Sequence, residues 1–579
     1  MCGIAGFNFK VKKDYILKKL YHRGPDEDGF FEDKNFSFFH TRLSIQDIKK
    51  GHQPFFYKNY MIVFNGEIYN HLELRKNLEV NWTTSSDTET LLHLYLKYGE
   101  NMFDMLDGMF SFVIYDGKKL FLARDRSGKK PLYIYQKENK FGFSSEINVF
   151  KFLDLTIDED DIKQFLSTGF CESGYKEITE FPSGHYGYFT TSLKTYRYFD
   201  ILDYYKLPKI KNPLEELDKI LTKSVKNRLI SSDVEVGAFL SGGIDSGLVV
   251  AKASEYQQLK TFTIRFDGQF DESNLASLVA KKYNTTHEII DIKMNVLDNI
   301  ENILFNYGKP FFDSSAIPSY FVAEKARKHL KVVLNGDGAD EIFAGYRRYV
   351  PLYNNWDKIA KHFKFLLPLI RPDVRGGIMF LYRLIRASSK EGIEWYNTLL
   401  NDLFVDIYKF DSKKLSQIDK IIKDTKLNNF DKLLYLDFEL NLKGLLMKMD
   451  IATMSNSLEA RSPFLSKQML ETAPRLKNKI KGTTTKFILR ELAKKYLPNE
   501  VVTAKKRGFE IPLTNWVNGE LNEMIMSYLN NGFYKNFIDE KIIQKIIDRK
   551  IFIPEDKRAK ILYLLFSLEV WYNKTKKGV

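Results

Sequence analysis

Short runs in which hydrophobic and polar positions alternate dominate the N-terminal third of the chain. Residues 61–64, 111–115, 119–123, 131–135 and 141–143 are apolar or aromatic runs of this kind, separated by glycine and polar turns. Such runs are typical of β-strands. A helical pattern over residues 88–98 lies between two of them. The pattern therefore predicts a strand-rich N-terminal domain.

A different pattern begins near Leu214. Predicted helices at 214–229, 247–256 and 274–283 alternate with predicted strands at 234–240, 261–266, 287–292 and 331–334. Strands that alternate with helices indicate a doubly wound parallel sheet. After residue 350 the pattern is mostly that of amphipathic helices, so we expect additional helices there.

These patterns predict an α/β protein of two domains. We expect an N-terminal domain over residues 2–195 and a C-terminal domain over residues 214–579. The segment 196–213 between them contains Pro208 and Pro213 and is predicted to be a linker.

Composition narrows the class of protein. The chain has 579 residues and only two cysteines, which argues against a disulfide framework and a cysteine-based metal site. The net charge is +14. It indicates either that the protein attracts anionic ligands or only that the composition is rich in lysines dispersed along the chain. We expect no nucleic-acid partner, because no aromatic-interleaved basic motif occurs. No apolar run is long enough for a membrane span and no secretory signal is evident, so we expect no membrane insertion and a cytoplasmic protein.

The chain opens with Met1 followed by Cys2. Removal of Met1 would make Cys2 the N-terminal residue and give its thiol a base, because an α-amine has a pKa of about 7.7–8.0. That amine can take the thiol proton directly or through one water. A cysteine at this position by chance is the alternative interpretation.

Further motifs follow in order: residues 22–26 (HRGPD), 40–45 (HTRLSI), 64–70 (FNGEIYN), 85–89 (SSDTE) and 124–128 (RDRSG). Together with Cys2, they resemble the glutaminase domain of the class II, N-terminal-nucleophile amidotransferases, especially that of asparagine synthetases. The resemblance implies an αββα sandwich. It also implies that Cys2 is the nucleophile and that the Asn65 side chain and Gly66 N–H form the oxyanion hole.

The same resemblance implies a glutamine site. The guanidinium of Arg42 offers a planar fork for the α-carboxylate of glutamine. Asp87 suits the α-ammonium, and Glu67 is implied to do the same. The resemblance adds Leu43, Ile45, Asn65 and Gly66 to the glutamine-binding residues.

A second candidate site begins where the apolar run 236–240 meets Ser241-Gly242-Gly243-Ile244-Asp245-Ser246. Glycines let a backbone approach phosphate closely, and loop amides at a helix N-terminus bind anions. Asp245 cannot bind an anion unless a cation intervenes, so it implies Mg²⁺. SGGxDS after a strand resembles the pyrophosphate loop of the N-type ATP pyrophosphatases, which predicts AMP and pyrophosphate as products. A chance Gly-Gly turn is the alternative.

Later motifs resemble the C-terminal domain of asparagine synthetases. They are residues 312–318, 334–341, 344–349, 448–450, 457–464 and 505–509, with Pro512 and Trp516. The resemblance implies that Asp245 and Asp340 hold Mg²⁺, that Lys448 stabilises the leaving phosphates and that Asp337 acts in forming and aminating an acyl-adenylate. It implies ATP binding by Leu240, Ser241, Gly242, Gly243, Asp245, Ser246, Ile264, Asn335 and Gly336.

Two positions depart from the family pattern. Many members have glutamate where this chain has Asp337, and commonly serine where it has Asn335. These departures put the acceptor in doubt more than the reaction. The expected activity is therefore that of a glutamine-hydrolysing asparagine synthetase with ATP and Mg²⁺ as cofactors and aspartate as acceptor. Alternatives are amidation of another carboxylate, such as a uronic acid of a surface polysaccharide, and a catalytically silent binding protein. The oligomeric state stays open, with a homodimer as one alternative.

Overall fold

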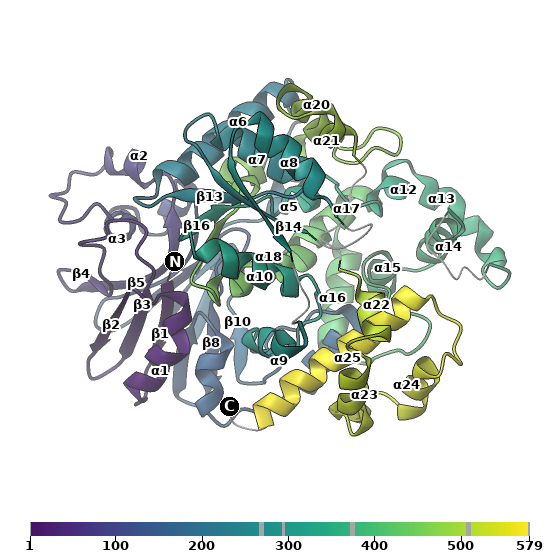
Figure 1. Ribbon diagram of the computed structural model, residues 1–579. Helices are drawn as coiled ribbons and strands as arrows, with labels where there is room; N and C mark the ends of the chain where they lie inside the picture. Colours follow the sequence, from purple (N-terminus) through teal and green to yellow (C-terminus); the bar gives the residue numbers. More distant parts are fainter. Residues whose placement is uncertain (1, 266–270, 292–295, 371–376, 505–510, 577–579) are drawn as a thin grey trace.

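The computed structural model describes residues 2–265, 271–291, 296–370, 377–504 and 511–576. Its N-terminal part contains two six-stranded antiparallel sheets, seen at the left of Figure 1. The first has the order β10-β8-β9-β1-β3-β2. It consists of β1 (Cys2–Phe7), β2 (Glu27–Glu32), β3 (Ser37–Arg42), β8 (Tyr133–Lys137), β9 (Lys140–Ser144) and β10 (Ile178–Glu180).

The second sheet has the order β12-β11-β7-β6-β5-β4. It consists of β4 (Phe55–Tyr57), β5 (Tyr60–Ile68), β6 (Gly108–Tyr115), β7 (Leu120–Arg124), β11 (His185–Phe189) and β12 (Leu193–Arg197). Residues such as Phe38, Val63 and Phe143 pack between the two sheets because alternate side chains of a strand point to one face. The helix α1 (Lys13–Leu20) packs on the first sheet and α3 (Asp87–Tyr98) on the second, which confirms the predicted αββα sandwich.

The second part of the chain contains a five-stranded sheet with the order β15-β14-β13-β16-β17, and all its strand pairs are parallel. Its strands are β13 (Val236–Phe239), β14 (Lys260–Arg265), β15 (Thr286–Asp291), β16 (Val332–Leu334) and β17 (Glu459–Arg461). On β16, Val332 and Leu334 pack into one core cluster and Val333 into another, so both faces of the sheet are buried. This is the doubly wound parallel sheet predicted from the sequence.

Helices cover both faces of this sheet. The helices α6 (Pro213–Ile230), α7 (Ile244–Ala253) and α8 (Ser273–Lys282) contribute to the core cluster on one face, and α10 (Ala316–Arg327) with α18 (Leu442–Met454) lies on the other. Figure 1 shows these two layers above and below the strands. The elements at 214–283 agree with the predicted helices and strands to within a few residues.

The expected additional helices surround this core. They include α9 (Val296–Asn306), α11 (Ala339–Ile342), α12 (Tyr349–Tyr353), α13 (Trp356–Ala360), α14 (Gly377–Ser388), α15 (Gly392–Leu399), α16 (Lys413–Asp424), α17 (Asn429–Leu436), α19 (Lys467–Thr472), α20 (Phe487–Tyr496), α21 (Asn499–Thr503), α22 (Leu513–Asn518), α23 (Asn522–Asn530), α24 (Glu540–Ile547) and α25 (Glu555–Lys576). In the described ranges, no helix is both long enough and apolar enough to cross a bilayer.

The segment 196–213 is only partly irregular. Strand β12 ends at Arg197, inside the predicted linker, and a short helix α5 (Ile201–Tyr205) follows it. Ile201 is buried in the core cluster that includes α6. This part of the segment is therefore packed onto the second domain. The expected boundaries of the two domains stay a prediction.

Candidate active sites

The predicted nucleophile Cys2 is the first residue of β1, and the strand register places it opposite Arg42 of β3. Burial raises the pKa of its thiol, while nearby positive charge and the Leu43 backbone N–H act in the opposite direction. The Cys2 backbone N donates a hydrogen bond to Asn65 Oδ1 at 3.3 Å. Asn65 therefore holds the atom that becomes the α-amine when Met1, which lies outside the described residues, is removed.

The predicted oxyanion-hole residues lie on β5 beside this nitrogen. Asn65 is fully buried, and its Nδ2 lies 3.4 Å from Ser145 Oγ, which is a long hydrogen bond. A Cβ on Gly66 would lie 2.2 Å from the carbonyl oxygen of Met109, so only glycine fits there. The structure therefore brings Cys2, Asn65 and Gly66 together at one end of the sandwich.

Arg42 is buried and makes more protein contacts than the sequence suggested. Its guanidinium donates to the carbonyl oxygens of Gln46, Asp47 and Ile48 and to Glu27 Oε2, the last at 2.9 Å. These four bonds use both Nη atoms. A substrate carboxylate would have to displace one of these acceptors or use Nε. Its role in binding glutamine stays a prediction.

Leu43 and Ile45 follow Arg42, but their side chains are buried in the core cluster that includes α6 and β13. The Ile45 carbonyl oxygen also accepts a hydrogen bond from the Asp233 backbone N at 2.9 Å. The side chains of these two residues are therefore part of the core of the second domain, and a role in binding glutamine stays a prediction.

Glu67 and Asp87 form a buried carboxyl pair. Burial and the neighbouring Asp87 charge raise the pKa of Glu67 well above its usual range. Burial raises the pKa of Asp87 to about 6, although its carboxylate accepts the Ile68 backbone N–H at 2.8 Å. Glu67 Oε1 is buried and has no hydrogen-bond partner among the described residues. A cationic donor beside Glu67 Oε1 and the Asp87 carboxylate would satisfy both groups, and the α-ammonium of an amino acid is such a donor.

Arg461 connects this pair to the parallel sheet. It is the last residue of β17, is fully buried, and donates to Glu67 Oε2 at 3.0 Å and to Glu459 Oε1 at 2.5 Å. It also donates to the Ser231 hydroxyl and to the Arg228 carbonyl oxygen. Burial opposes ionisation of Glu459, but nearby positive charges, including Arg461, hold its pKa at about 2. The sequence contained Arg461 only as part of a motif, so this role was missed.

The predicted pyrophosphate loop follows β13 and leads into α7. Ser246 Oγ and Ser241 Oγ lie 2.9 Å apart, and Ser241 Oγ also accepts the Gly243 backbone N–H at 3.2 Å. A Cβ on Gly242 would lie 2.9 Å from the Glu272 carbonyl oxygen. The two serines thus hold the loop closed on itself, with Gly242 and Gly243 at its turn, which is the conformation expected of a phosphate-binding loop.

The two predicted metal carboxylates meet at a lysine that sequence reasoning missed. Lys486 is almost fully buried, and its Nζ contacts Asp245 Oδ2 at 2.5 Å and Asp340 Oδ1 at 2.6 Å. A Cβ on Gly345 would clash with Asp340, so that glycine permits the approach. Lys486 lies 241 residues after Asp245 in the sequence, in a segment without a recognisable local pattern.

These carboxylates fit a magnesium ion in part. Asp245 Oδ1 is buried without a hydrogen-bond partner in the described part of the chain. No group of three or more ligating side chains occurs among the described residues. Mg²⁺ is usually bound by one or two carboxylates together with waters and substrate phosphates. The pair therefore suits a metal that arrives with a nucleotide rather than a permanent protein-bound ion.

The remaining predicted nucleotide residues lie at the carboxyl ends of the parallel strands, where α/β sheets bind ligands. Leu240 and Ile264 are buried in separate core clusters. The Gly336 backbone lies against Asp245, because a Cβ there would be 3.0 Å from the Asp245 Cβ. Asn335 Nδ2 donates to Asp337 Oδ2 at 2.7 Å, and Asn335 Oδ1 accepts from Ser462 Oγ. The unusual Asn335 thus orients the unusual Asp337.

Lys448 lies on α18. Its Nζ donates to Ser315 Oγ at 2.9 Å and lies 3.6 Å from Asp313 Oδ2. The cation found against Asp245 and Asp340 is Lys486. The action of Lys448 on the leaving phosphates stays a prediction. The motif at 505–509 lies outside the described residues.

A buried cluster of charges lies between the two candidate sites. Arg23 donates to the Cys2 carbonyl oxygen and to Asp450 Oδ2, the latter at 2.9 Å. Lys130 Nζ donates to the other oxygen of Asp450 at 3.0 Å. Lys129 Nζ reaches Asp337 Oδ2 at 3.3 Å. Residues of the sandwich therefore contact both the nucleophile and the acidic residue of the parallel-sheet domain.

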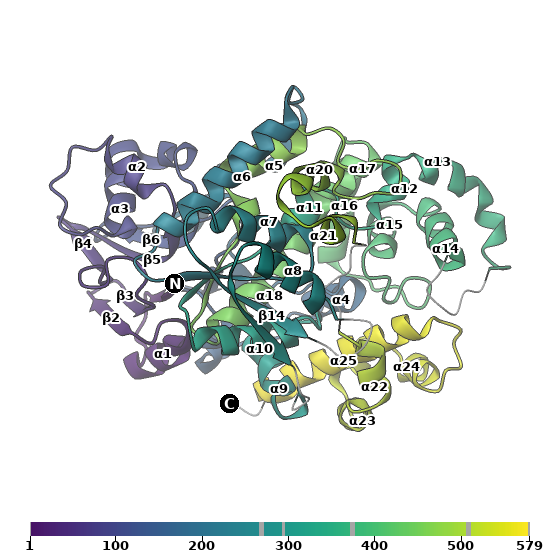
Figure 2. The ribbon, with the colours of Figure 1, turned by 45° about the horizontal axis from the view of Figure 1, so that its top comes forward.

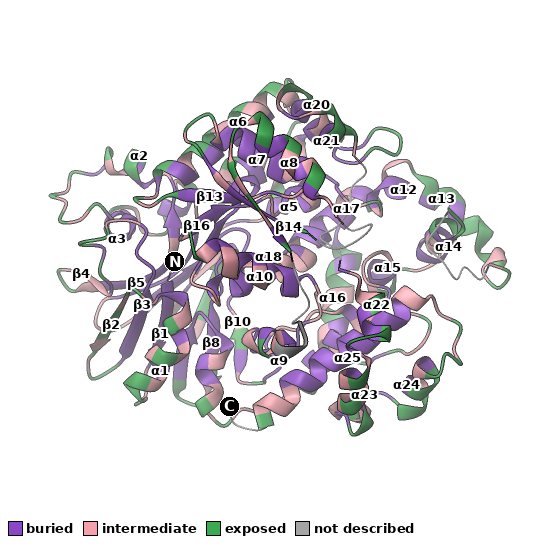
Figure 3. Ribbon diagram, viewed as in Figure 1, coloured by how far each residue is buried: buried purple, intermediate pink, exposed green. Residues whose placement is uncertain are grey.

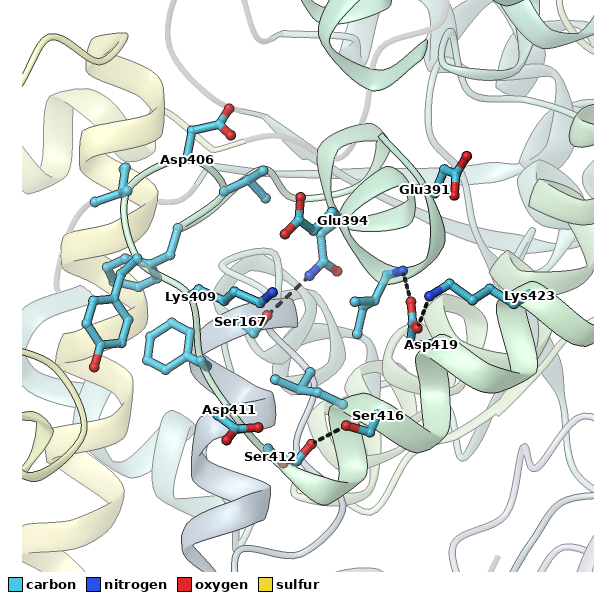
Figure 4. A pocket seen from close by; sticks show the side chains of 18 residues that line it. Ser167, Glu391, Glu394, Asp406, Lys409, Asp411, Ser412, Ser416, Asp419 and Lys423 are labelled. Carbon is cyan, nitrogen blue, oxygen red and sulfur yellow. Dashed lines mark hydrogen bonds and ion pairs between the residues drawn. The ribbon is translucent and has the colours of Figure 1, made fainter. Parts of the chain in front are cut away.

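A cavity of about 640 Å³ lies away from these sites. It is bordered by α15, α16 and Ser167 of α4 (Glu159–Thr168), and the ion pair of Asp419 and Lys423 lies on its wall (Figure 4). It contains none of the predicted catalytic, glutamine-binding or nucleotide-binding residues. This cavity is therefore separate from the predicted chemistry.

The fold and the two sites define a two-domain amidotransferase, with an N-terminal-nucleophile glutaminase sandwich and a parallel-sheet synthetase domain. The glutamine amidotransferase domain family matches residues 1–199, and the asparagine synthase family matches residues 216–573. The chain therefore belongs to the asparagine synthetase family, whose members are glutamine-dependent ligases.

Curated relatives agree with this assignment. Asparagine synthetase [glutamine-hydrolyzing] 1 of Bacillus subtilis is 31% identical over 99% of this chain and 96% of its own length. Asparagine synthetase [glutamine-hydrolyzing] 3 of the same organism is 27% identical over 88% of this chain and 87% of its own length. Asparagine synthetase B of Escherichia coli is 29% identical over 74% of this chain and 77% of its own length.

Proposed function

We propose that the protein is a glutamine-hydrolysing asparagine synthetase. It would convert ATP, L-aspartate, L-glutamine and water into AMP, pyrophosphate, L-asparagine and L-glutamate through a β-aspartyl-AMP intermediate. The observation that carries the proposal is the buried Arg23–Asp450–Lys130 cluster, which joins the Cys2 site to the helix of the synthetase domain that also bears Lys448. Glutamine and ATP are cytoplasmic metabolites, so the proposal also places the enzyme in the cytoplasm.

In the glutaminase half, the mature chain begins at Cys2. The α-amine held by Asn65 takes the thiol proton, and the sulfur attacks the side-chain amide carbon of glutamine. Asn65 Nδ2 and the Gly66 N–H stabilise the oxyanion; one such donor contributes about 3 kcal/mol. The C–N bond then breaks, the amine returns the proton, and ammonia leaves behind a thioester. Water hydrolyses the thioester to glutamate and restores the thiol.

In the synthetase half, the Ser241–Ser246 loop and the neighbouring strand ends bind ATP. Asp245 and Asp340 would hold Mg²⁺, which neutralises charge on the pyrophosphate when bound. Lys486 contacts both carboxylates and keeps them in position. The aspartate β-carboxylate displaces pyrophosphate from the α-phosphorus, and ammonia then displaces AMP from the acyl carbon. Because ammonium is not a nucleophile, ammonia has to travel between the sites in neutral form.

A second candidate acceptor is favoured by one observation. Asn335 and Asp337 both depart from the family pattern, and they are hydrogen-bonded to each other at 2.7 Å. Such a paired change next to the acyl-transfer position fits an acceptor other than aspartate, such as a uronic acid. The chemistry of both halves would stay the same.

Mass spectrometry of the amidated product tests the proposal. The enzyme is incubated with ATP, Mg²⁺, amide-¹⁵N glutamine and either aspartate or galacturonate. We expect ¹⁵N-asparagine, and its absence together with a labelled uronamide would transfer the proposal to the second acceptor. Cys2→Ala is the control: it should make no product from glutamine but still make asparagine from an ammonium salt. If no amide forms from any acceptor, the synthetase assignment is wrong.

A further inference from the structure

The largest group of exposed large apolar side chains in the described part of the chain lies in one protruding segment. Eight of them lie between residues 356 and 381, on α13, the 3-10 helix η5 (Lys361–Leu366), the turn after it and the first turn of α14. They are Trp356, Ile359, Phe363, Phe365, Leu369, Ile378, Phe380 and Leu381. We refer to these eight residues as the apolar tip.

The apolar tip projects away from the rest of the molecule. Figures 1 and 2 both show α13 and α14 at the end of the molecule opposite the glutaminase sandwich. Exposed residues are frequent on this protrusion in Figure 3. Within the tip, Leu369 is 78% exposed, Phe365 69% and Ile378 68%. A surface with side chains this exposed is accessible to a large, flat partner.

These side chains are not needed for the packing of the protrusion itself. The protrusion has its own small core, in which Ala360 of α13 packs against Leu384 and Ile385 of α14. Leu367 and Ile370 cover that core from the side. None of the eight residues of the apolar tip belongs to that core. Exposed apolar side chains that gather in one segment often mark an interaction site.

The exposed charged residues in the described parts of the tip segment, 356–370 and 377–381, are lysines. Lys358, Lys361 and Lys364 are exposed among the apolar residues. The one acidic residue in the described part of 355–388 is Asp357, which is buried and accepts a hydrogen bond from Asn429 Nδ2 at 2.8 Å. Exposed Phe, Leu, Ile and Trp side chains mixed with lysines are typical of surfaces that lie in the interface of an anionic membrane.

We propose that the apolar tip and its three lysines form a peripheral docking surface for an anionic lipid bilayer. The apolar side chains would enter the headgroup region while the lysines contact lipid phosphates. A second copy of this chain fits less well, because a symmetric contact would bring the same lysines together. No spanning helix is required for such binding. The inference does not depend on which acceptor the enzyme uses.

Vesicle sedimentation with the full-length enzyme tests this proposal. We expect binding to vesicles of phosphatidylcholine mixed with phosphatidylglycerol, and little binding to phosphatidylcholine alone. Binding to the mixed vesicles should fall as salt is raised, since salt screens the lysines. Equal binding to both vesicle types, or binding to neither, would overturn the proposal.

Two variants separate the contribution of the lysines to vesicle binding from that of the apolar side chains. The reversal K358E/K361E/K364E should weaken binding to mixed vesicles about a hundredfold, because each lysine near an anionic surface contributes roughly fivefold. The variant F365S/L369S/I378S should also lose binding. The control L72S/L207S/I421S removes three exposed apolar residues outside the tip and should bind like the unchanged enzyme.

Two further measurements distinguish a loss of lipid binding from misfolding and from a change in self-association. Ammonium-dependent synthesis and the unfolding temperature should be unchanged in the charge-reversal variant, which alters only exposed side chains. Analytical ultracentrifugation reports self-association. If the tip variants convert a dimer to a monomer while the unchanged enzyme does not bind vesicles, the surface is an interface between copies and the proposal is wrong.

Discussion

Glu67 and Asp87 are single residues whose burial determines how they can bind a substrate. Burial raises the pKa of Asp87 to about 6, and burial together with the Asp87 charge raises the pKa of Glu67 well above its usual range. Near neutral pH, Asp87 is charged. A glutamine α-ammonium would satisfy both groups, since Glu67 Oε1 lacks a partner among the described residues.

The first prediction concerns pH. We expect KM for glutamine to rise as the pH drops through about 6, because protonated Asp87 no longer attracts the ammonium. Unfolding would not explain the loss: a raised carboxyl pKa makes the folded state bind more protons, so this group stabilises the fold at low pH and loses that contribution as pH rises. Asp87→Asn should raise KM for glutamine roughly tenfold or more and remove this pH dependence. An unchanged profile in the variant would contradict the assignment.

The second prediction concerns the carboxylates at Lys486. Asp245→Asn and Asp340→Asn should each lower the rate of synthesis by roughly a hundredfold, because the charge that would hold Mg²⁺ is lost while the shape is kept. Basal glutaminase activity should persist, since the Cys2 site is unaltered. Asp154→Asn, at a side chain 97% exposed, is the control. The assignment fails if either variant at Asp245 or Asp340 synthesises amide at the normal rate.

Sequence motifs identified the carboxylates Asp245 and Asp340, but not the lysine that contacts both of them. Asp245 and Asp340 lie in recognisable motifs after strand ends, and the fold brings them to one point. The contacts of Lys486 were not predictable, because they depend on how α20 packs against α7 and α6. Likewise, the buried positions of the Leu43 and Ile45 side chains depend on the neighbouring domain. Local pattern predicts residue chemistry, whereas tertiary packing decides which groups meet.

Among the elements, the short strand β17 carries a contact between the two domains. It spans three residues, Glu459–Arg461, and forms the edge of the parallel sheet beside β16. Its last residue, Arg461, contacts Glu67 of the sandwich. This edge strand therefore connects the parallel sheet to the predicted glutamine site of the sandwich. Longer elements such as α3 and β14 were predictable from hydrophobic periodicity, but a three-residue strand is too short to show one.

The third prediction follows from β17. Arg461→Ala should destabilise the protein by about 3–5 kcal/mol, because it leaves buried Glu67 and Glu459 without their cation. Urea unfolding measures the change. The matched control is Arg265→Ala at the end of β14, whose exposed ion pair with Asp291 should contribute only about 0–1 kcal/mol. Equal losses in the two variants would show that Arg461 does not link the domains.

For the whole molecule, the buried cluster at Asp450 is a direct contact between the two halves. Arg23 and Lys130 come from the sandwich and Asp450 from α18. Burial opposes the charge on Asp450, yet these two cations hold its pKa at about 2. The stability from this cluster is therefore present above pH of about 4 and is lost as pH falls toward about 2.

The fourth prediction tests this coupling. Asp450→Asn should remove the counterion of Lys130 and one of the two carboxylates bound to Arg23, whose other partner is Glu146, and should loosen the contact between the halves. Glutamate formed per amide product should then rise above one, while ammonium-dependent synthesis is largely kept. Assays of glutamate and asparagine in the same reaction measure the ratio. A ratio that stays at one in a folded variant would show that this cluster has no part in coupling.

The central claim is that the synthetase half activates a carboxylate as an acyl-adenylate. Its most direct test uses aspartate labelled with ¹⁸O in the β-carboxylate, incubated with ATP, Mg²⁺ and glutamine. The attack of the carboxylate on the α-phosphorus transfers one carboxylate oxygen to AMP when ammonia releases it. We therefore predict one ¹⁸O atom in AMP and none in pyrophosphate, as read by mass spectrometry. Label in inorganic phosphate, with ADP as the nucleotide product, would contradict the account.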